Sequence, residues 1–357
     1  MKKNKAAQNL PAGSQRATSA DIARELGISA MTVSRALNNR PNVKEETRQQ
    51  VARMARKMGY VPDLIARSLV LRKTLTIGVV VPEITHSFFP EAIRGIEEAI
   101  YAAGYHLIFA HSAERPERER DVLQTLESKR VDGILISTTE TGGDVAFYKH
   151  IIARGTPLIF FDRCVYGIGA SCVCIDDEES AQAITEHLIG HGYTRIAHLC
   201  GSQHVPIARA RFNGFKKALK KAKLALREEW VAESGFHEQG GYEAMQKLLR
   251  LPVRARPRAV VAVNDPAAFG AIKAIQENGL ELPQDVAIVG FSDDIRAALM
   301  PTPLTTVRQP AYLLGKRAAE KLLAIVEGNS EAGGEIIVET EQVIRQSCGC
   351  NVAETIG

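Results

Sequence analysis

Short apolar runs alternate with amphipathic segments from Thr76 onward. The runs at 76–82, 105–112, 131–137 and 156–162 are predicted to be buried parallel strands, and segments such as 90–104 to be helices. The same alternation returns at 194–201, 259–265 and 286–293. Because this alternation of strands and helices occurs twice along the chain, we predict an α/β core of two subdomains with parallel sheets. Small ligands of such sheets bind beyond the carboxyl ends of the strands.

Three short helices are predicted within residues 18–60, at 19–26, 30–37 and 45–58, and the last closes at Gly59. Thr18, with Asp21, caps the first helix, which ends at Gly27, and Ser29 caps the second. A three-residue turn with a glycine between two short helices is typical of the helix-turn-helix motif. The apolar side chains predicted to form a small core are Ile22, Leu26, Ile28, Val33, Leu37, Val43, Val51 and Met54.

Positive charge is concentrated at the start of the chain. Residues 2–73 carry 15 Lys and Arg against 5 Asp and Glu, whereas the rest carries 30 against 36. The net charge of +4 is therefore the sum of a basic N-terminal segment and an acidic remainder. Such a segment is the electrostatic signature of a domain that meets phosphate groups, with a solvated basic tail as the alternative.

The sequence argues against membrane insertion and export. No apolar run reaches the roughly 18 residues that cross a bilayer, and the first 17 residues are polar, so we expect a cytoplasmic protein with no membrane partner. Its six cysteines are expected to be reduced, and Cys172 and Cys174 to pack on one face of a strand. The "SCGC" at 347–350 could bind a soft metal or oxidise, but no metal site and no cofactor is predicted.

Several motifs occur together and in order: "MTVSRALN" at 31–38, "PNV" at 41–43, "ARSL" at 66–69 and "PLTTVRQ" at 303–309. As a set they resemble the LacI family of bacterial transcriptional regulators, and the match runs from about residue 18 to residue 349. The resemblance implies an all-α helix-turn-helix head and a hinge helix. It also implies a periplasmic-binding-protein-like core that dimerises and binds an effector.

The predicted divisions are a basic, disordered extension at 1–17, the helix-turn-helix domain at 18–60, a hinge helix and linker at 61–73, the effector-binding and dimerisation core at 74–350, and a tail at 351–357. The N-subdomain is expected at about 74–175 and 308–338, and the C-subdomain at about 176–307 and 339–350. The extension carries Lys2, Lys3, Lys5 and Arg16 and could add salt-sensitive phosphate affinity, with a neutral tail as the alternative. The tail has no apolar heptad, so a tetramerisation helix is not expected.

The predicted helix at 30–37 has two faces. Val33, Ala36 and Leu37 face the small core, which leaves Ala30, Met31, Ser34 and Arg35 on the opposite side. By resemblance, Ala30, Met31 and Arg35 read bases in the major groove. Arg35 can donate two hydrogen bonds to guanine, worth about 1–3 kcal/mol of discrimination, whereas Ala30 and Met31 offer only apolar contacts. Partial burial of Met31 is the alternative. Phosphate or backbone contacts, including the cap, are expected from Thr18, Ser29, Thr32, Ser34, Asn38 and Arg40.

The hinge segment holds a helix too short to be stable without packing, so we expect it to order when a partner binds. An ordinary connecting helix is the alternative. The resemblance makes Leu69 the wedge that enters the minor groove at the centre of a palindromic site, with Ala66 one turn earlier. Replacement of Leu69 by alanine is expected to weaken operator binding and to leave effector affinity nearly unchanged.

The resemblance also assigns effector contacts, which are Phe89, Thr139, Asp162, Arg211, Phe236, Asn264, Ser292, Asp293 and Gln309. Carboxylates that bind adjacent hydroxyls and aromatic faces that pack on a ring favour a sugar or sugar derivative. Phe89 and Phe236 could instead be core residues, and Asp162 could cap a helix.

The segment "GFSDD" departs from the family, in which an aspartate commonly follows the "GF" pair. Ser292 stands there and Asp293 follows, so either Asp293 takes the role or the pocket binds fewer hydroxyls. Arg211 could equally hold a carboxylate or phosphate, which leaves a nucleobase or acidic metabolite open as effector.

These features predict a sequence-specific transcriptional regulator, in the first instance a repressor. It would bind a palindromic double-stranded operator as a homodimer and respond to a small-molecule effector. A sugar-binding transport protein is the main alternative, but the basic head and the lack of an export signal argue against it. No nucleotide-binding, metalloprotease or serine-hydrolase motif occurs, so no catalytic residue is predicted and the protein is not expected to be an enzyme.

Overall fold

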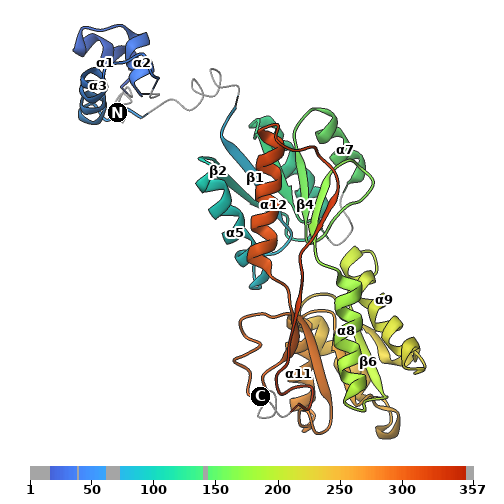
Figure 1. Ribbon diagram of the computed structural model, residues 1–357. Coiled ribbons are helices and arrows are strands. Elements are labelled where there is room, and N and C mark those ends of the chain that lie inside the picture. Colours follow the sequence, from blue (N-terminus) through green and yellow to red (C-terminus); the bar gives the residue numbers. More distant parts are fainter. Residues whose placement is uncertain (1–16, 38–39, 62–72, 140–143, 351–357) are drawn as a thin grey trace, which may run out of the picture. The chain divides into compact units, whose positions relative to one another are not determined.

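The structure is a computed structural model that describes residues 17–37, 40–61, 73–139 and 144–350. The chain divides into two compact units, Met1–Thr74 and Leu75–Gly357, which are treated separately below (Figure 1). Predictions for the extension at 1–16, for Asn38, for the hinge residues Ala66 and Leu69 and for the tail at 351–357 lie outside the described residues.

The first unit contains the three predicted helices: α1 (Ser19–Leu26), α2 (Ala30–Leu37) and α3 (Glu45–Lys57). Thr18 and Asp21 form a reciprocal capping box at the start of α1, in which each side chain accepts from the other residue's backbone N–H. Gly27 ends α1 with φ of 66°, a left-handed conformation that glycine adopts without strain. The predicted core is confirmed, and Ala23, Ala36 and Ala55 are also buried in it.

The N-terminal half of the second unit is built on a six-stranded sheet in the order β11-β5-β4-β3-β1-β2, parallel throughout. Its strands are β1 (Thr76–Val81), β2 (His106–His111), β3 (Gly133–Ile136), β4 (Leu158–Phe161), β5 (Ser171–Cys174) and β11 (Glu335–Ile337). Helices α5 (Phe88–Ala102) and α12 (Ala311–Val326) pack on one face, and α6 (Pro116–Ser128) and α7 (Val145–Ala153) on the other.

The other half has a second six-stranded sheet in the order β12-β10-β9-β8-β6-β7. Its strands are β6 (Ile196–Cys200), β7 (Val231–Glu233), β8 (Ala259–Ala262), β9 (Ala287–Ser292), β10 (Thr305–Arg308) and β12 (Glu341–Val343). Helices α8 (Asp177–Gly190) and α9 (Pro206–Lys221) pack on one face, and α10 (Glu238–Leu249) and α11 (Asp265–Glu277) on the other. Two 3-10 turns, at Glu228–Trp230 and Val253–Ala255, complete this half.

The predicted α/β core of two subdomains is confirmed, with two corrections. β2 is parallel to β1, but it is an edge strand with an exposed Phe109, so it is not buried as predicted. β12 runs antiparallel to β10, although only parallel strands were predicted. Three cysteines, Cys164, Cys172 and Cys174, pack in one apolar cluster, as predicted for the pair on the strand. Among the described residues, no helix has the length and apolar character to cross a bilayer.

The chain passes between the two sheets three times, after β5, after β10 and after β11 (Figure 1). The two halves of the core are therefore joined by three segments that lie far apart in the sequence. Loops that follow β1, β4, β8 and β9 at the carboxyl ends of these strands line one common cavity. This arrangement agrees with the rule that parallel α/β sheets bind ligands beyond those ends.

Candidate functional site

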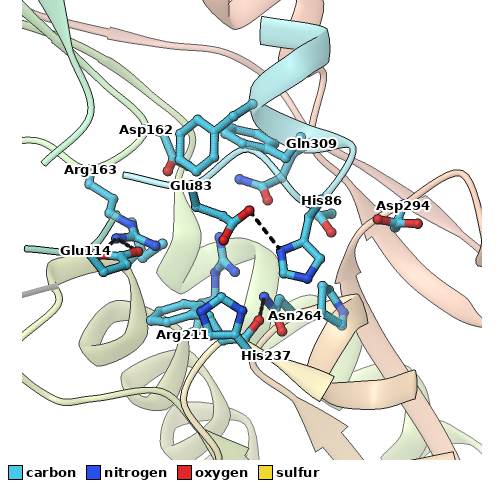
Figure 2. Close-up of a pocket in the computed structure, with 16 residues that line it drawn as sticks. Glu83, His86, Glu114, Asp162, Arg163, Arg211, His237, Asn264, Asp294 and Gln309 are labelled. Atoms are coloured by element: carbon cyan, nitrogen blue, oxygen red, sulfur yellow. Dashed lines mark hydrogen bonds and ion pairs between the residues drawn. The ribbon is translucent and has the colours of Figure 1, made fainter. Parts of the chain in front are cut away.

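A cavity in the second unit gathers residues from both sheets (Figure 2). It is lined by the predicted residues Phe89, Asp162, Arg211, Phe236, Asn264, Ser292 and Gln309. It is also lined by residues that sequence reasoning did not single out, among them Glu83, His86, Glu114, Arg163, His237 and Asp294. The missed Arg163 directly follows Asp162 after β4, and Glu83 lies two residues after β1, so position at the carboxyl end of a strand was the available signal.

Two predicted effector contacts, Thr139 and Asp293, are not among the residues that line this cavity. Thr139 is fully buried, and its backbone N–H donates to the Glu119 carboxylate at 2.8 Å. Asp293 forms ion pairs with Arg308 and Arg345, at 2.8 Å and 2.7 Å. The aspartate that lines the cavity is the next residue, Asp294.

Arg211 is a buried cation at the floor of the cavity. Its Nε donates to Asp177 at 2.7 Å, its Nη1 donates to the Val263 carbonyl at 2.8 Å, and the guanidinium lies 3.8 Å from the centre of the Phe291 ring. These contacts fix the plane of the guanidinium and leave Nη2 for a ligand. Burial raises the pKa of Asp177 to about 6, although the neighbouring Arg211 acts in the opposite direction.

A second buried cation, Arg163, approaches the cavity from the N-terminal sheet. Its Nη1 donates to both carboxylate oxygens of Glu114, at 2.8 Å and 3.1 Å, and its guanidinium lies 5.0 Å from the centre of the Phe236 ring. Phe236 belongs to the other half of the core, so this stacking contact crosses the cleft. Two fixed guanidinium groups give the cavity the capacity to hold an oxygen-rich or anionic ligand.

The polar groups of the cavity are incompletely paired among the described residues. Gln309 Nε2 and Arg163 Nε are buried and have no hydrogen-bond partner there. Burial raises the pKa of the Asp162 carboxyl above its usual value, while Arg163 and Arg211 act to lower it. Unpaired buried donors cost free energy, so a ligand that accepts hydrogen bonds from them would gain affinity.

Asn264 and Phe89 each have a structural role as well as a place in the cavity wall. Asn264 caps α11, because its Oδ1 accepts from Ala267 N at 3.0 Å and its Nδ2 donates to the Phe236 carbonyl at 2.8 Å. Phe89 is only 5% exposed and packs edge-on against Phe161 in the core. Phe89 can therefore be a core residue and line the cavity at the same time.

Three residues at the cavity and its rim have positive φ without being glycine: Asp162 at 60°, Ser292 at 122° and Asp293 at 56°. These conformations cost free energy for residues with a Cβ, and such strain is concentrated at functional sites. Two of them, Ser292 and Asp293, directly precede Asp294, which lines the cavity.

Contacts of His86 and Ser87, which lie before α5, with residues of the other half join the two halves of the core beside the cavity. His86 Nε2 lies 3.2 Å from a Glu238 carboxylate oxygen, and the other oxygen of Glu238 accepts from Arg296 at 2.8 Å. Arg296 also pairs with Asp294, whose second oxygen accepts from Ser87 N at 3.4 Å. Burial acts to raise the pKa of Asp294, but the contacts with Arg296 outweigh it and bring that pKa to about 2. The His86–Glu238 and Ser87–Asp294 contacts therefore link the two halves of the core.

The outer face of α2 in the first unit is exposed, as predicted. Ala30, Ser34 and Arg35 are exposed, and Met31 is 63% exposed, which argues against the alternative that it fills a gap in the core. Ser29 Oγ accepts from Thr32 N at 3.1 Å and lies 2.8 Å from Thr32 Oγ1, so the predicted cap is present. This capped, exposed helix has the position and size of an element that enters a major groove.

Known proteins resemble both units. A model for bacterial regulatory proteins of the lacI family matches residues 18–63, and one for a periplasmic binding protein-like domain matches residues 185–348. The ribose operon repressor of Haemophilus influenzae is 36% identical over 332 residues, which cover 93% of this chain and 98% of the relative. The HTH-type transcriptional repressor PurR of Vibrio parahaemolyticus is 33% identical over 333 residues, with the same coverage of 93% and 98%.

Solved structures show the same similarity. The lac repressor dimer bound to operator and the anti-inducer ONPF has a TM-score of 0.84 at 25% identity, covering 94% of this chain and 99% of that one. The complex of the transcriptional regulator CelR with cellobiose has a TM-score of 0.70 at 28% identity, covering 93% and 100%. The similarity extends over nearly the whole chain.

Proposed function

The chain belongs to the LacI family of bacterial regulatory proteins, and from this premise we propose that it is a sequence-specific transcriptional repressor controlled by a small-molecule effector. One observation carries the proposal. A capped helix with an exposed outer face and a polar cavity between two α/β subdomains occur in the same chain. The first is suited to reading DNA and the second to binding a metabolite.

On the DNA side, we assign base contacts to Ala30, Met31 and Arg35. Arg35 is the hydrogen-bonding member, and the exposed Met31 side chain suits an apolar contact such as a thymine methyl group. Thr18, Ser29, Thr32, Ser34 and Asn38 are assigned to phosphate or backbone positioning. The assignment of Ala66 and Leu69 to the minor groove rests on the resemblance alone, because the described residues do not include the hinge.

On the effector side, we assign the ligand to the cavity that contains Asp162, Arg163, Arg211 and Gln309. A sugar or sugar derivative is favoured, because aromatic side chains alternate with carboxylate, amide and guanidinium groups around the cavity. The relatives include a ribose operon repressor and a regulator solved with cellobiose. The two buried arginines favour a sugar acid or sugar phosphate as the second candidate, since either can pair with an anionic oxygen.

We propose that the repressor acts as a homodimer in the cytoplasm, without catalytic activity. A two-fold dimer presents two copies of α2 and therefore matches a palindromic operator. Closing or opening of the cleft would change the geometry of the dimer and thus the affinity for the operator. The direction of that change distinguishes an inducer from a corepressor and has to be measured.

The experiment is a fluorescence-anisotropy titration of the full-length protein on DNA from upstream of its own gene, with a scrambled duplex of equal length as control. The salt concentration is varied, because phosphate contacts alone give strongly salt-dependent, non-selective binding. We expect selective binding that changes when a sugar, sugar acid or sugar phosphate is added. Equal affinity for both duplexes at every salt and ligand concentration would contradict the proposal.

A further inference from the structure

Two histidines and two cysteines from distant parts of the chain meet at the C-terminal end of α8. His187 lies in the last turn of α8 and His191 follows four residues later, so both rings project from one side of the helix, with centroids 4.7 Å apart. Cys348 and Cys350 lie after β12. Cys350 Sγ is 3.6 Å from His187 Nε2, 3.0 Å from His191 Nε2 and 3.2 Å from Cys348 Sγ.

The turn between the two cysteines brings both sulfur atoms to the same side. Gly349 has φ of 93°, a conformation that residues with a Cβ rarely adopt, and a Cβ at this position would lie 2.9 Å from the hydroxyl of Tyr193. The spacing of one residue between the cysteines therefore depends on a glycine. Nitrogen and sulfur ligands at a helix end and in a tight turn form a compact, partly exposed cluster that a solvated ion can reach.

We propose that His187, Cys348 and Cys350, whose ligand atoms all lie within 4.8 Å of one another, form a tetrahedral binding site for zinc or a chemically similar divalent metal ion, with the neighbouring His191 as the fourth ligand. Bond lengths of about 2.3 Å to sulfur and about 2.1 Å to nitrogen place neighbouring ligands of such an ion about 3.4–3.8 Å apart. The three separations from Cys350 Sγ, 3.2 Å to Cys348, 3.6 Å to His187 and 3.0 Å to His191, differ from these values by up to about 0.6 Å. Rotation of the side chains, above all that of His191, would complete the coordination.

A group beside the cluster can orient one of the proposed ligands. The Thr305 hydroxyl lies 3.1 Å from Cys348 Sγ. Such a contact would orient a thiolate ligand from outside the coordination sphere.

The remaining described cysteines have different surroundings. Cys164, Cys172 and Cys174 pack in an apolar cluster, and Cys200 is buried against the Ala232 carbonyl. A four-ligand site is closed and therefore structural rather than catalytic. Bound metal would fasten the segment after β12 to α8, whose first residue, Asp177, holds Arg211 in the effector cavity at the opposite end of the helix.

The test is a Co²⁺ titration of full-length protein that has been reduced and treated with a chelator. We expect one Co²⁺ per chain, with the absorption bands of a tetrahedral thiolate complex, which Zn²⁺ then removes. Cys350→Ser and His191→Ala should each weaken the affinity by about tenfold or more, because each removes a ligand. Zn²⁺ should also raise the Tm of the wild type more than that of either variant, since it binds the folded form.

Two variants serve as matched controls. His204→Ala removes an exposed imidazole elsewhere in the C-terminal half, and Cys200→Ser removes a thiol outside the cluster, so both should bind Co²⁺ like the wild type. His191 is exposed and Cys350 is partly exposed, and circular dichroism would verify that their variants fold. Reduced wild-type protein that takes up no Co²⁺, or variants at Cys350 and His191 that bind as tightly as the wild type, would overturn the proposal.

Discussion

Arg35 is the hydrogen-bonding residue of the proposed base-reading set on α2, next to the apolar Ala30 and Met31. We predict that Arg35→Ala reduces the preference for the operator over a duplex with one altered G·C pair, by about 1–3 kcal/mol. Competition binding at fixed salt against duplexes altered one base pair at a time would measure it. Specificity should be lost at one position of each half-site and retained elsewhere.

The control for this prediction is Arg56→Ala, which removes an exposed positive charge from α3 of the same unit. It should weaken binding to all duplexes alike, as the loss of a long-range phosphate attraction does. If Arg35→Ala also weakened every duplex by one common factor, Arg35 would be a phosphate contact.

Gln309 is buried, and its Nε2 makes no hydrogen bond of normal geometry among the described residues, although its side chain acts to lower the pKa of the neighbouring Asp162. We predict that Gln309→Met, which keeps the volume and removes the polar group, leaves the stability of the effector-free protein unchanged or slightly higher. An unpaired buried donor contributes no favourable bond, whereas its pairing with a ligand is worth about 1 kcal/mol or more. The Tm without ligand and the ligand-induced Tm shift would show the two effects separately.

The ligand for that experiment is the compound that raises the Tm of the wild type most in a screen of sugars, sugar acids and sugar phosphates. Gln246→Met on α10, at a position outside the cavity lining, is a control that should leave the ligand-induced shift unchanged. A Gln309→Met variant with reduced stability and an unchanged ligand shift would contradict the assignment of Gln309 to the effector.

At the scale of elements, sequence patterns predicted most of the fold because each depends on local chemistry. Thr18, Gly27 and Ser29 determine the ends of α1 and the start of α2 through caps and a left-handed residue. The edge position of β2 and the antiparallel β12 depend on which strands become neighbours, which no local pattern encodes. The position of Asp294 in the cavity lining follows two residues with positive φ, Ser292 and Asp293, which no local pattern predicted either.

Asp265 joins three elements of the C-terminal half at the start of α11. Its two carboxylate oxygens accept from Thr306 Oγ1 on β10 at 2.6 Å and from Asp294 N after β9 at 2.7 Å. The side chain has no exposure, and burial raises its pKa to about 7 although these hydrogen bonds act to lower it. The folded form therefore holds a proton in a pH range in which the unfolded chain has released it.

We predict that this carboxyl lowers the free energy of unfolding as the pH rises from about 4 to about 7, because the unfolded chain binds fewer protons there. The contribution of Asp265 to the free energy of unfolding is complete at a pH below its pKa in the unfolded chain. It is lost at a pH above its pKa in the folded protein. Each unit of pKa difference is worth about 1.4 kcal/mol. Urea unfolding across this range should give a shallower decline for Asp265→Asn than for the wild type. The exposed Asp121→Asn serves as control, and a wild-type slope in Asp265→Asn would refute the prediction.

At the scale of the whole molecule, the contact between His86 and Glu238 links the two halves of the core across the cleft, and Arg296 pairs with Glu238 within the C-terminal half. We predict that Glu238→Gln lowers effector affinity, because the contact between His86 and the Glu238 carboxylate across the cleft is lost. Each exposed pair is worth at most about 1 kcal/mol, so a decrease of roughly two- to tenfold is expected. Glu243→Gln, on the same helix but exposed and outside the cavity lining, should have no effect.

Effector and operator affinities of the proposed repressor must be coupled reciprocally. If an effector changes operator affinity by some factor, bound operator changes effector affinity by the same factor. Calorimetric titration of effector into free protein and into the protein–operator complex would test this equality. Unequal factors would indicate that a further equilibrium, such as dimer dissociation, takes part.

The order of strands along the chain differs from their order in space. β11 and β12 complete the edges of the two sheets, yet they follow every other strand in the sequence. During synthesis on the ribosome, α1 to α3 can fold early, whereas neither sheet of the core can be completed until β11 and β12 have been translated. A chain that ended after α12 would thus contain a folded helix-turn-helix unit, but both sheets of its core would lack an edge strand. It could occupy DNA without responding to a metabolite, so errors in translation near the 3′ end of the message would be more harmful than the short length of the missing segment suggests.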